Sequence, residues 1–322
     1  MPRLPPSLLW RARREISPMA TLLLLACRDL QSAANELRWI CEHVRDTRSP
    51  IPPGLRVWQL CEKRGQGVPL QYVLGTQPFG HLDIKCRPGV LIPRPETEAY
   101  TLHLASLLTK ERGTLNPLSI LDLCTGTGCI PLLLTSLLLK PPNHLPIPPR
   151  IAALGIDISP KAISLARQNH HHNARLGHLP PPAVTEEGEA EVAFYQADIF
   201  SPTFLQSLQT FSSLSSSSGP SSNQTRTKTW DLLTANPPYI SPRGFATDTA
   251  RSVRNHEPKT ALVPGDGYQH PDHYGCRPED AFYARILEIA QLLSPRPPRR
   301  VLLEVGGWEQ AVRVVTMALA QG

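Results

Sequence analysis

Apolar residues near the start of the chain recur at helical spacing. They fall every three or four positions, which places them on one face of a helix; the set is Leu23, Ala26, Cys27, Leu30, Ala34, Leu37, Cys41 and Val44. We therefore expect a small helical domain that begins at about Ser17. The runs Gln71–Leu74 and His81–Lys85 flank a glycine-bounded turn region and predict a β-hairpin. With this hairpin, the predicted domain covers residues 17–86.

A linker and a second domain are expected after the hairpin. Pro93-Arg94-Pro95 excludes regular helix and indicates a linker over residues 87–98. From Ala99 onward, helical and strand patterns alternate, which predicts an α/β domain with a parallel sheet covered on both faces. The expected strands are Ser119–Leu123, Ile151–Ile156, Val192–Gln196, Asp231–Ala235 and Arg300–Glu304.

Three segments interrupt this alternation and are interpreted as surface insertions. They are Pro141–Pro149, His170–Gly188 and Ser207–Lys228. Their polar or proline-rich composition buries too little apolar surface for independent order. The run His170-His171-His172 therefore indicates low complexity, and no metal site is expected.

Composition narrows the possible functions. The 322 residues carry a formal charge of +6 without a block of like charges, so direct, sequence-independent DNA binding is not expected. The seven cysteines are scattered and odd in number, which fits reduced thiols in an intracellular protein. The apolar run Leu22–Cys27 is too short to cross a bilayer, so we expect no membrane partner.

The first 16 residues have the character of a basic leader. Arg3, Arg11, Arg13 and Arg14 occur among the first 14 residues without an acid. A mitochondrial presequence and a frayed basic tail both fit this composition.

The candidate chemistry lies at the ends of the predicted strands. The first strand leads into Asp122-Leu123-Cys124-Thr125-Gly126-Thr127-Gly128. Glycines at such a turn let a ligand approach the backbone, and the following helix offers unpaired N–H groups. Taken alone, this glycine turn is equally well explained as a tight connection between a strand and a helix. The next strands end in acids, Asp157 placed to bind a ribose and Asp198 placed to bind an adenine amino group.

Two common nucleotide-binding motifs are excluded. A nicotinamide dehydrogenase would have a third glycine at position 131, where this chain has proline, and no Gly-Lys-Ser/Thr of a P-loop follows the glycines.

The fourth predicted strand ends in Asn236-Pro237-Pro238-Tyr239. Two prolines fix their own φ angles and keep the preceding residue extended, so the carbonyl groups of this corner have fixed directions. Such a corner can hold a planar amide or amine.

Several of these segments resemble one known family. The segments are Asp122–Gly128, Asp157, Asp198, Asn236–Tyr239, Pro69–Gly75, Val90–Glu98, Asn255–Pro258 and Leu303–Gly306. Together they look like the HemK-like release factor glutamine methyltransferases, from about residue 17 to Gln310. Asn-Pro-Pro-Tyr alone is shared with DNA adenine methyltransferases, whereas Ile92–Glu98 is far more specific.

The resemblance implies a Rossmann-like class I methyltransferase sheet in residues 99–322. It implies transfer of a methyl group from S-adenosylmethionine to the glutamine nitrogen in the Gly-Gly-Gln loop of a class I peptide release factor. The helical domain would bind this protein partner, and any contact with the ribosome would be indirect. Such a domain accompanies the bacterial and organellar members, which with the leader favours mitochondria over the cytoplasm.

The resemblance also assigns residue roles. Cys124, Thr125, Gly126, Thr127 and Gly128 would line the methionine part of the cofactor, Asp157 the ribose, and Asp198 with Ile199 the adenine. Asn236 would contact both cofactor and substrate, and Asn236 with the Pro237 carbonyl would hold the glutamine amide, with Pro238 and Tyr239 beside it. Cys124 stands where the family usually has glycine. Glu96 and Glu98 would position the loop rather than act as acid or base.

Three expectations remain open at this stage. The family normally continues into a final antiparallel hairpin, so the chain is expected to lack the last two strands of the sheet. A DNA or RNA adenine methyltransferase is one alternative, with the corner holding a flipped base. A degenerate methyltransferase that binds a translation factor without turnover is the other.

Overall fold

The computed structural model describes residues 4–110, 118–139, 150–182, 190–208, 229–265, 276–293 and 298–321. The chain forms two compact units. The first unit comprises Met1–Gln77, Cys86–Pro88 and Thr249–Glu257. The second comprises Pro78–Lys85, Gly89–Asp248 and Pro258–Gly322.

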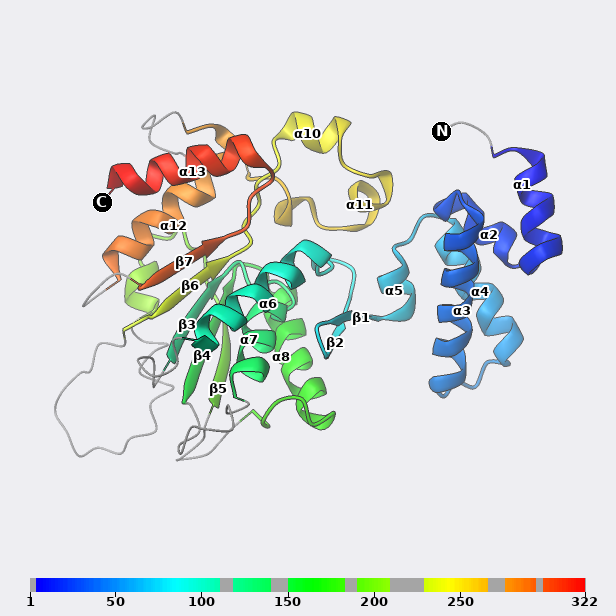
Figure 1. Ribbon diagram of the computed structural model, residues 1–322, viewed down its shortest axis with the longest axis horizontal. Helices are drawn as coiled ribbons and strands as arrows, with labels where there is room; N and C mark the ends of the chain where they lie inside the picture. Colours follow the sequence, from blue (N-terminus) through cyan, green and yellow to red (C-terminus); the bar gives the residue numbers. More distant parts are fainter. Residues whose placement is uncertain are drawn as a thin grey trace. The chain divides into compact units, whose positions relative to one another are not determined.

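The first unit is a group of helices around its own apolar core. The helices of this core are α1 (Pro6–Arg11), a π-helix (Ala12–Ile16), α2 (Ala20–Cys27), α3 (Leu30–Asp46), α4 (Pro53–Gly65) and α5 (Leu70–Leu74) (Figure 1). The same unit includes α11 (Arg251–His256), of which no residue belongs to this core. Leu23, Leu24 and Ile40 are fully buried in this core. Asp29 caps α3 by accepting a hydrogen bond from the Ser32 N–H at 2.7 Å.

The leader is not a frayed tail from residue 6 onward. Ala12 is fully buried, and Leu8, Leu9 and Ile16 pack against the core of the first unit. Burial of Ala12 and partial burial of the three aliphatic residues give this segment a structural role, because apolar contact stabilises the ordered form.

One predicted strand is wrong. Gln71–Leu74 lies in α5, and the hairpin consists of β1 (Thr76–Phe79) and β2 (Leu82–Lys85). Leu70 and Val73 are buried three residues apart on one helix face, and Gly75 ends the helix at a φ of 84°. A short apolar run does not distinguish one helical turn from a strand, which explains the error.

The second unit contains a parallel sheet, as predicted. Among the described residues the strand order is β5-β4-β3-β6-β7. The strands are β3 (Leu118–Leu123), β4 (Ile151–Asp157), β5 (Ala190–Gln196), β6 (Leu232–Ala235) and β7 (Arg300–Leu303). All four pairings are parallel, with Leu123 beside Ile156 on one side and Ala235 on the other. The α/β, Rossmann-like fold class is therefore confirmed.

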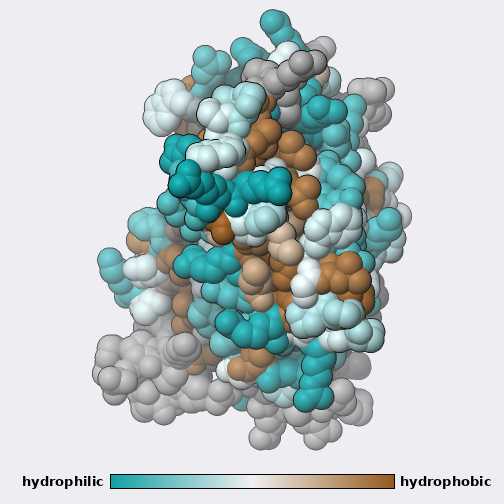
Figure 2. Space-filling view, turned by 90° about the vertical axis from the view of Figure 1, so that its right-hand side faces the viewer, coloured by the Kyte–Doolittle hydropathy of each residue, from teal (hydrophilic) through white to brown (hydrophobic). Residues whose placement is uncertain are grey.

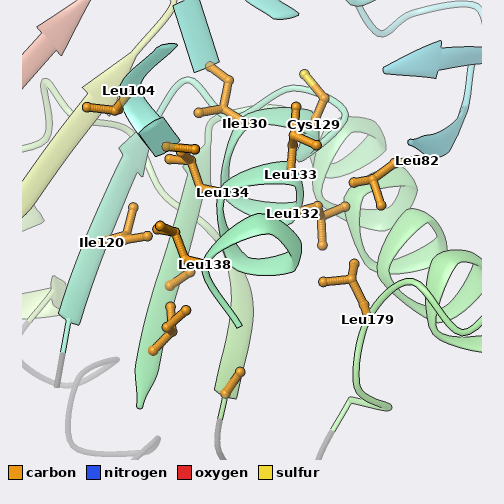
Figure 3. Packing of buried hydrophobic residues seen from close by; sticks show 14 of the residues in the cluster. Leu82, Leu104, Ile120, Cys129, Ile130, Leu132, Leu133, Leu134, Leu138 and Leu179 are labelled. Atoms are coloured by element: carbon orange, nitrogen blue, oxygen red, sulfur yellow. The ribbon is translucent and has the colours of Figure 1, made fainter. Parts of the chain in front are cut away.

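Helices cover both faces of this sheet (Figure 1). One face packs against α6 (Pro95–Lys110), α7 (Cys129–Leu138) and α8 (Pro160–Arg175), and the other against α12 (Ala281–Leu292). α13 (Trp308–Gln321) lies on α12, and the short α10 (Pro242–Thr247) and two 3-10 turns (Lys259–Ala261 and Pro278–Asp280) lie in connecting segments. Alternate residues of β3 serve the two faces, Ile120 toward α7 and Leu121 toward α12. Figure 3 shows the leucines of α7 within the first cluster.

Two further boundaries differ from the sequence predictions. α6 begins at Pro95, inside the expected linker, because proline fits the first turn of a helix. His170, His171 and His172 lie in α8 rather than in an insertion, and His170 is buried. Pro141–Pro149, residues 183–189 and residues 209–228 lie outside the described residues.

The exposed surface contains apolar side chains in both units. Trp10, Trp39 and Trp58 are exposed in the first unit and Trp308 in the second. Figure 2 shows brown hydrophobic patches between teal hydrophilic residues on the face that it presents. Within the described ranges, no helix combines the length and apolar character needed to cross a membrane.

Candidate active site

A cavity of about 390 Å³ opens where the carboxyl ends of four strands meet. Every residue that lines it belongs to the second unit. The wall includes Cys124–Thr127 after β3, Asp157 as the last residue of β4, Asp198 and Ile199 after β5, and Asn236 and Pro238 after β6. In an open parallel sheet the strand order reverses at such a point, leaving a crevice for a ligand. The volume is in the range of small-molecule sites.

The loop after β3 is held close to the end of β4. The Thr125 N–H donates to the Ile156 carbonyl at 2.9 Å, and the Gly126 N–H donates to Asp157 Oδ2 at 2.9 Å. Gly126 has a φ of 55°, and open space lies where its Cβ would be. This space lets a ligand reach the loop backbone.

Gly128 has a packing role instead and does not line the cavity. Its φ is 77°, and a Cβ on it would lie 2.9 Å from the Phe194 ring and 3.0 Å from the Ala166 side chain. It also precedes the first residue of α7. Gly128 therefore allows close contact between α7, α8 and β5, and its contact with the cofactor stays a prediction.

Asp157 and Asp198 both present carboxylates to the cavity. Asp157 Oδ2 accepts from the Gly126 N–H and Oδ1 from the Ser159 N–H at 2.9 Å, while Asp198 Oδ1 accepts from the Phe200 N–H at 2.9 Å. A carboxylate oxygen with one partner keeps another lone pair for a ligand hydroxyl or amine. Burial raises the pKa of Asp157 above its usual value, although its two backbone hydrogen bonds lower it.

Ile199 is buried and gives the cavity an apolar surface next to Asp198. Phe282 of α12 adds an aromatic surface to the same wall. A flat ring with an amino group at its edge would match this combination of apolar faces and a carboxylate.

Two side chains at the carboxyl end of β3, Asp122 and Cys124, have raised pKa values. Burial raises the pKa of Asp122 to about 7; its Oδ1 accepts a hydrogen bond from Thr234 Oγ1 at 2.6 Å. Asp122 thus connects β3 to β6 beneath the cavity. Burial and the charges of Asp157, Asp122 and Asp198 raise the pKa of Cys124 well above the usual thiol value. The Cys124 thiol therefore stays protonated and is a poor nucleophile.

The Asn-Pro-Pro-Tyr corner divides between the cavity and the protein interior. Asn236 and Pro238 line the cavity, whereas Pro237 and Tyr239 do not. The Tyr239 hydroxyl donates to Glu304 Oε1 at 3.1 Å, and its ring packs in the cluster formed by α12 and α13. Burial, followed by the Glu304 charge, raises the pKa of Tyr239. Tyr239 therefore stabilises the corner from the protein interior, through its hydrogen bond to Glu304 and its packing in this cluster.

The cavity is also lined by residues for which the sequence predicted no ligand contact. Gly89–Arg94 and Thr97 line one side of the cavity, and Pro258, Thr260, Ala261 and Val263 line another. Glu96 and Glu98 lie in the first turn of α6 and do not line it. The Ile92–Glu98 motif was the available signal for the first group. The second group begins at Pro258, the last residue of the family-like segment Asn255–Pro258, and its other members follow that segment.

The histidine run takes part in structural contacts. The His170 ring is within 3.2 Å of the Pro180 carbonyl, and the His172 ring is within 2.7 Å of Asp83 Oδ2. In the part of the chain that the structure describes, no group of three or more His, Cys, Asp or Glu side chains is arranged to hold a metal ion.

The fold and this cavity define the class as a Rossmann-like methyltransferase, with a glycine loop, two acids and an Asn-Pro-Pro corner around one pocket. The Saccharomyces cerevisiae protein named "Mitochondrial MRF1 N(5)-glutamine methyltransferase MTQ1" is 35% identical over 295 residues, covering 90% of this chain and 78% of that protein. The Schizosaccharomyces pombe protein named "Probable MRF1 mitochondrial N(5)-glutamine methyltransferase mtq1" is 35% identical over 305 residues, covering 92% and 83%. The chain belongs to the release factor glutamine methyltransferase family.

More distant relatives agree with this assignment. The Bacillus subtilis protein named "Release factor glutamine methyltransferase" is 29% identical over 259 residues, covering 80% of this chain and 69% of that protein. No family model matches the chain. A crystal structure of an Agrobacterium tumefaciens SAM-dependent methyltransferase has a TM-score of 0.40 and 14% identity, covering 76% of this chain and 57% of that one. The family assignment therefore rests on the sequence relatives.

Proposed function

We propose that the cavity binds S-adenosylmethionine and that Asn236 presents a release factor glutamine to it for methylation of the side-chain nitrogen. The observation that carries this proposal is that Asn236 and Pro238 share one cavity wall with Gly126, Asp157 and Asp198. A methyl donor and its acceptor must meet in one place, and the relatives at 35% identity are named N(5)-glutamine methyltransferases.

The cavity residues fit this cofactor. The open space at Gly126 admits the amino acid part close to the backbone, Asp157 has lone pairs for ribose hydroxyls, and Asp198 with Ile199 suits an adenine ring. When bound, the cofactor supplies an electrophilic methyl group on a positively charged sulfur. The negative charges of Asp157 and Asp198 also favour a cationic ligand.

The protein's part in catalysis is to orient a weak nucleophile. The lone pair of an amide nitrogen is delocalised into its carbonyl, so the nitrogen reacts only when it is well aimed. The Asn236 Oδ1 would accept one N–H bond of the substrate amide. The backbone carbonyl of Pro237, which lies in the chain between the cavity-lining residues Asn236 and Pro238, would accept the other. Fixing two reacting groups in this way contributes several kcal/mol, on the order of the effects known for aligned intramolecular reactions. The nitrogen would take the methyl group as the methyl–sulfur bond breaks and its electron pair stays on sulfur. The nitrogen would release its proton afterwards, so no strong base is needed at the outset.

The test separates binding from transfer. Asn236→Ala should bind S-adenosylmethionine within about threefold of the unchanged protein by calorimetry, since the cofactor contacts at Asp157 and Asp198 remain. The same variant should lose methyl transfer to a recombinant class I release factor. Full transfer by Asn236→Ala would refute the assigned role. Methylation of single-stranded DNA in place of the release factor would favour an adenine methyltransferase. Absence of S-adenosylmethionine binding would favour a degenerate protein.

We also propose that the protein acts on a mitochondrial release factor. The support is that both fungal relatives carry mitochondrial names, together with the arginine-bearing leader. The first unit would provide the surface for the release factor, as the resemblance implied. Import of a reporter fused to the first forty or so residues tests the compartment. A reporter that stays in the cytosol would contradict it.

A further inference from the structure

A hydrogen-bonded chain runs from Asn236 to a carboxylate outside the cavity wall. The Asn236 Nδ2 donates to Thr97 Oγ1 at 3.4 Å, and Thr97 Oγ1 donates to Glu304 Oε2 at 2.6 Å. Thr97 is 2% exposed and lies in the first turn of α6, whereas Glu304 follows β7. The Glu304 backbone N–H also donates to the Ala235 carbonyl at 3.0 Å, immediately before Asn236.

The hydrogen bonds that link Asn236, Thr97 and Glu304 can form in only one donor-to-acceptor order. An ionised carboxylate has no proton to donate, so the Thr97 hydroxyl must donate to Glu304. A hydroxyl has a single proton, and Thr97 therefore offers Asn236 only lone pairs. Lone pairs can accept from the Nδ2 of Asn236 but cannot satisfy its Oδ1.

The direction fixes which end of the Asn236 carboxamide reaches the ligand. With Nδ2 turned toward Thr97, Oδ1 is the atom left to face a substrate. Among the described residues, no side chain or backbone group donates to Oδ1, and Asn236 lines the cavity. The reversed amide would present N–H groups to the N–H groups of a glutamine, which is repulsive.

We propose that Thr97 and Glu304 are positioning residues for methyl transfer: Glu304 sets the direction of the Thr97 hydroxyl, which holds the Asn236 amide with its oxygen toward the substrate nitrogen. This inference rests on the proposed function, since it assigns the geometry of that same site. Tyr239 contributes by donating to the other oxygen of Glu304, which limits rotation of the carboxylate.

The chain offers a matched control on the same helix. Thr101 is fully buried one turn after Thr97, and its Oγ1 donates to the Thr97 backbone carbonyl at 2.6 Å. It has no hydrogen bond to Asn236 or Glu304. Thr101→Val therefore removes a buried hydroxyl of the same kind from the same helix, and it leaves the side-chain hydrogen bonds of Thr97 to Asn236 and Glu304 in place.

The experiment compares Thr97→Val, Thr97→Ser, Glu304→Gln and Thr101→Val in the full chain. Methylation of a recombinant release factor carrying the Gly-Gly-Gln loop gives kcat and KM, calorimetry gives the Kd of S-adenosylmethionine, and thermal unfolding gives Tm. We expect kcat to fall about tenfold to hundredfold in Thr97→Val and Glu304→Gln, as for loss of a charge-assisted orienting contact. Cofactor Kd should stay within about threefold, because no cofactor contact is removed.

A conservative substitution and a double variant distinguish a positioning role of Thr97 from a purely structural one. Thr97→Ser keeps the hydroxyl and should retain kcat within about threefold, and Thr101→Val should do the same even if its Tm falls as far as that of Thr97→Val. In the double variant T97V/E304Q the losses should not add, because either change breaks the same chain.

The outcomes distinguish the two levels of the proposal. If the unchanged protein leaves the release factor unmethylated, the proposed function and the relay are both overturned. If the unchanged protein is active and Thr97→Val turns over at the same rate, or if Thr97→Ser is as impaired as Thr97→Val, the relay alone is overturned. Should Glu304→Gln fail to fold, the Thr97→Val and Thr97→Ser pair still decides the question.

Discussion

The buried carboxylate of Asp280 provides the sharpest stability prediction. Asp280 is 0% exposed and accepts from Arg313 Nε at 2.6 Å, Arg313 Nη2 at 3.0 Å and Gln310 Nε2 at 2.9 Å. Gln310 Nε2 also donates to the Tyr239 carbonyl at 3.3 Å. Asp280 thus holds Arg313 and Gln310 of α13, and Gln310 in turn contacts the corner that carries Asn236.

The expected cost of Asp280→Asn follows from these contacts. Removing one partner of a buried ion pair costs about 3–5 kcal/mol. Arg313 keeps 16% exposure, and asparagine keeps one acceptor oxygen, so we expect the lower end, about 3 kcal/mol of unfolding free energy. For a domain of this size, that loss lowers Tm by roughly 6–12 °C.

Chemical denaturation of Asp280→Asn measures this loss, and Glu288→Gln is the control. Glu288 pairs with Arg285 on the surface of α12 with its side chain 54% exposed, so its change should stay within about 0.5 kcal/mol. An equal effect of the two substitutions would refute the reasoning, because burial would then not set the strength of the pair.

The pH dependence of Asp280 gives an independent check. Burial alone would raise its pKa, but hydrogen bonds from Arg313, Gln310 and Arg277 lower it below the usual value. A lowered pKa contributes stability above the unfolded value of about 4, and this is lost as the pH falls through the folded pKa. The stability difference between the unchanged protein and Asp280→Asn should therefore shrink below about pH 4.

Three further predictions concern Asp157 at the end of β4 and two residues of the segment that follows β3, Gly128 and Cys124. Asp157→Ala should weaken S-adenosylmethionine binding about tenfold to hundredfold by calorimetry, through loss of charge-assisted hydrogen bonds; unchanged affinity would contradict the ribose assignment. Gly128→Ala should lower the Tm of the protein more than Gly177→Ala does. Both glycines have a φ of 77°, but only a Cβ at position 128 would lie 2.9 Å from the Phe194 ring, so equal losses of Tm would contradict this packing. The Cys124 thiol, whose pKa burial raises, should alkylate far more slowly at pH 8 than a free cysteine, and rapid labelling in a mass spectrum would show that it is not protonated.

The sequence predicted the sheet well because local patterns determine it. All five expected strands occur within a residue or two of their predicted ends, since short apolar runs bounded by Gly, Pro or Asp are typical of buried parallel strands. Parallel strands place their carboxyl ends at one edge, so Asp157, Asp198 and Asn236 could be expected to lie near one another.

The errors arose where local pattern is ambiguous. Gln71–Leu74 is one helical turn rather than a strand, and the histidine run belongs to α8, where Asn169 and Asn173 bond the backbone of β2. The contact between Thr97 and Glu304 joins residues 207 positions apart, and only the folded sheet brings them together.

The decisive measurement is tandem mass spectrometry of a mitochondrial class I release factor after incubation with this protein and isotopically labelled S-adenosylmethionine. We expect one labelled methyl group on the side-chain nitrogen of the Gly-Gly-Gln glutamine, and none when Asn236→Ala replaces the unchanged protein. An unlabelled release factor, or label on a different residue, would contradict it.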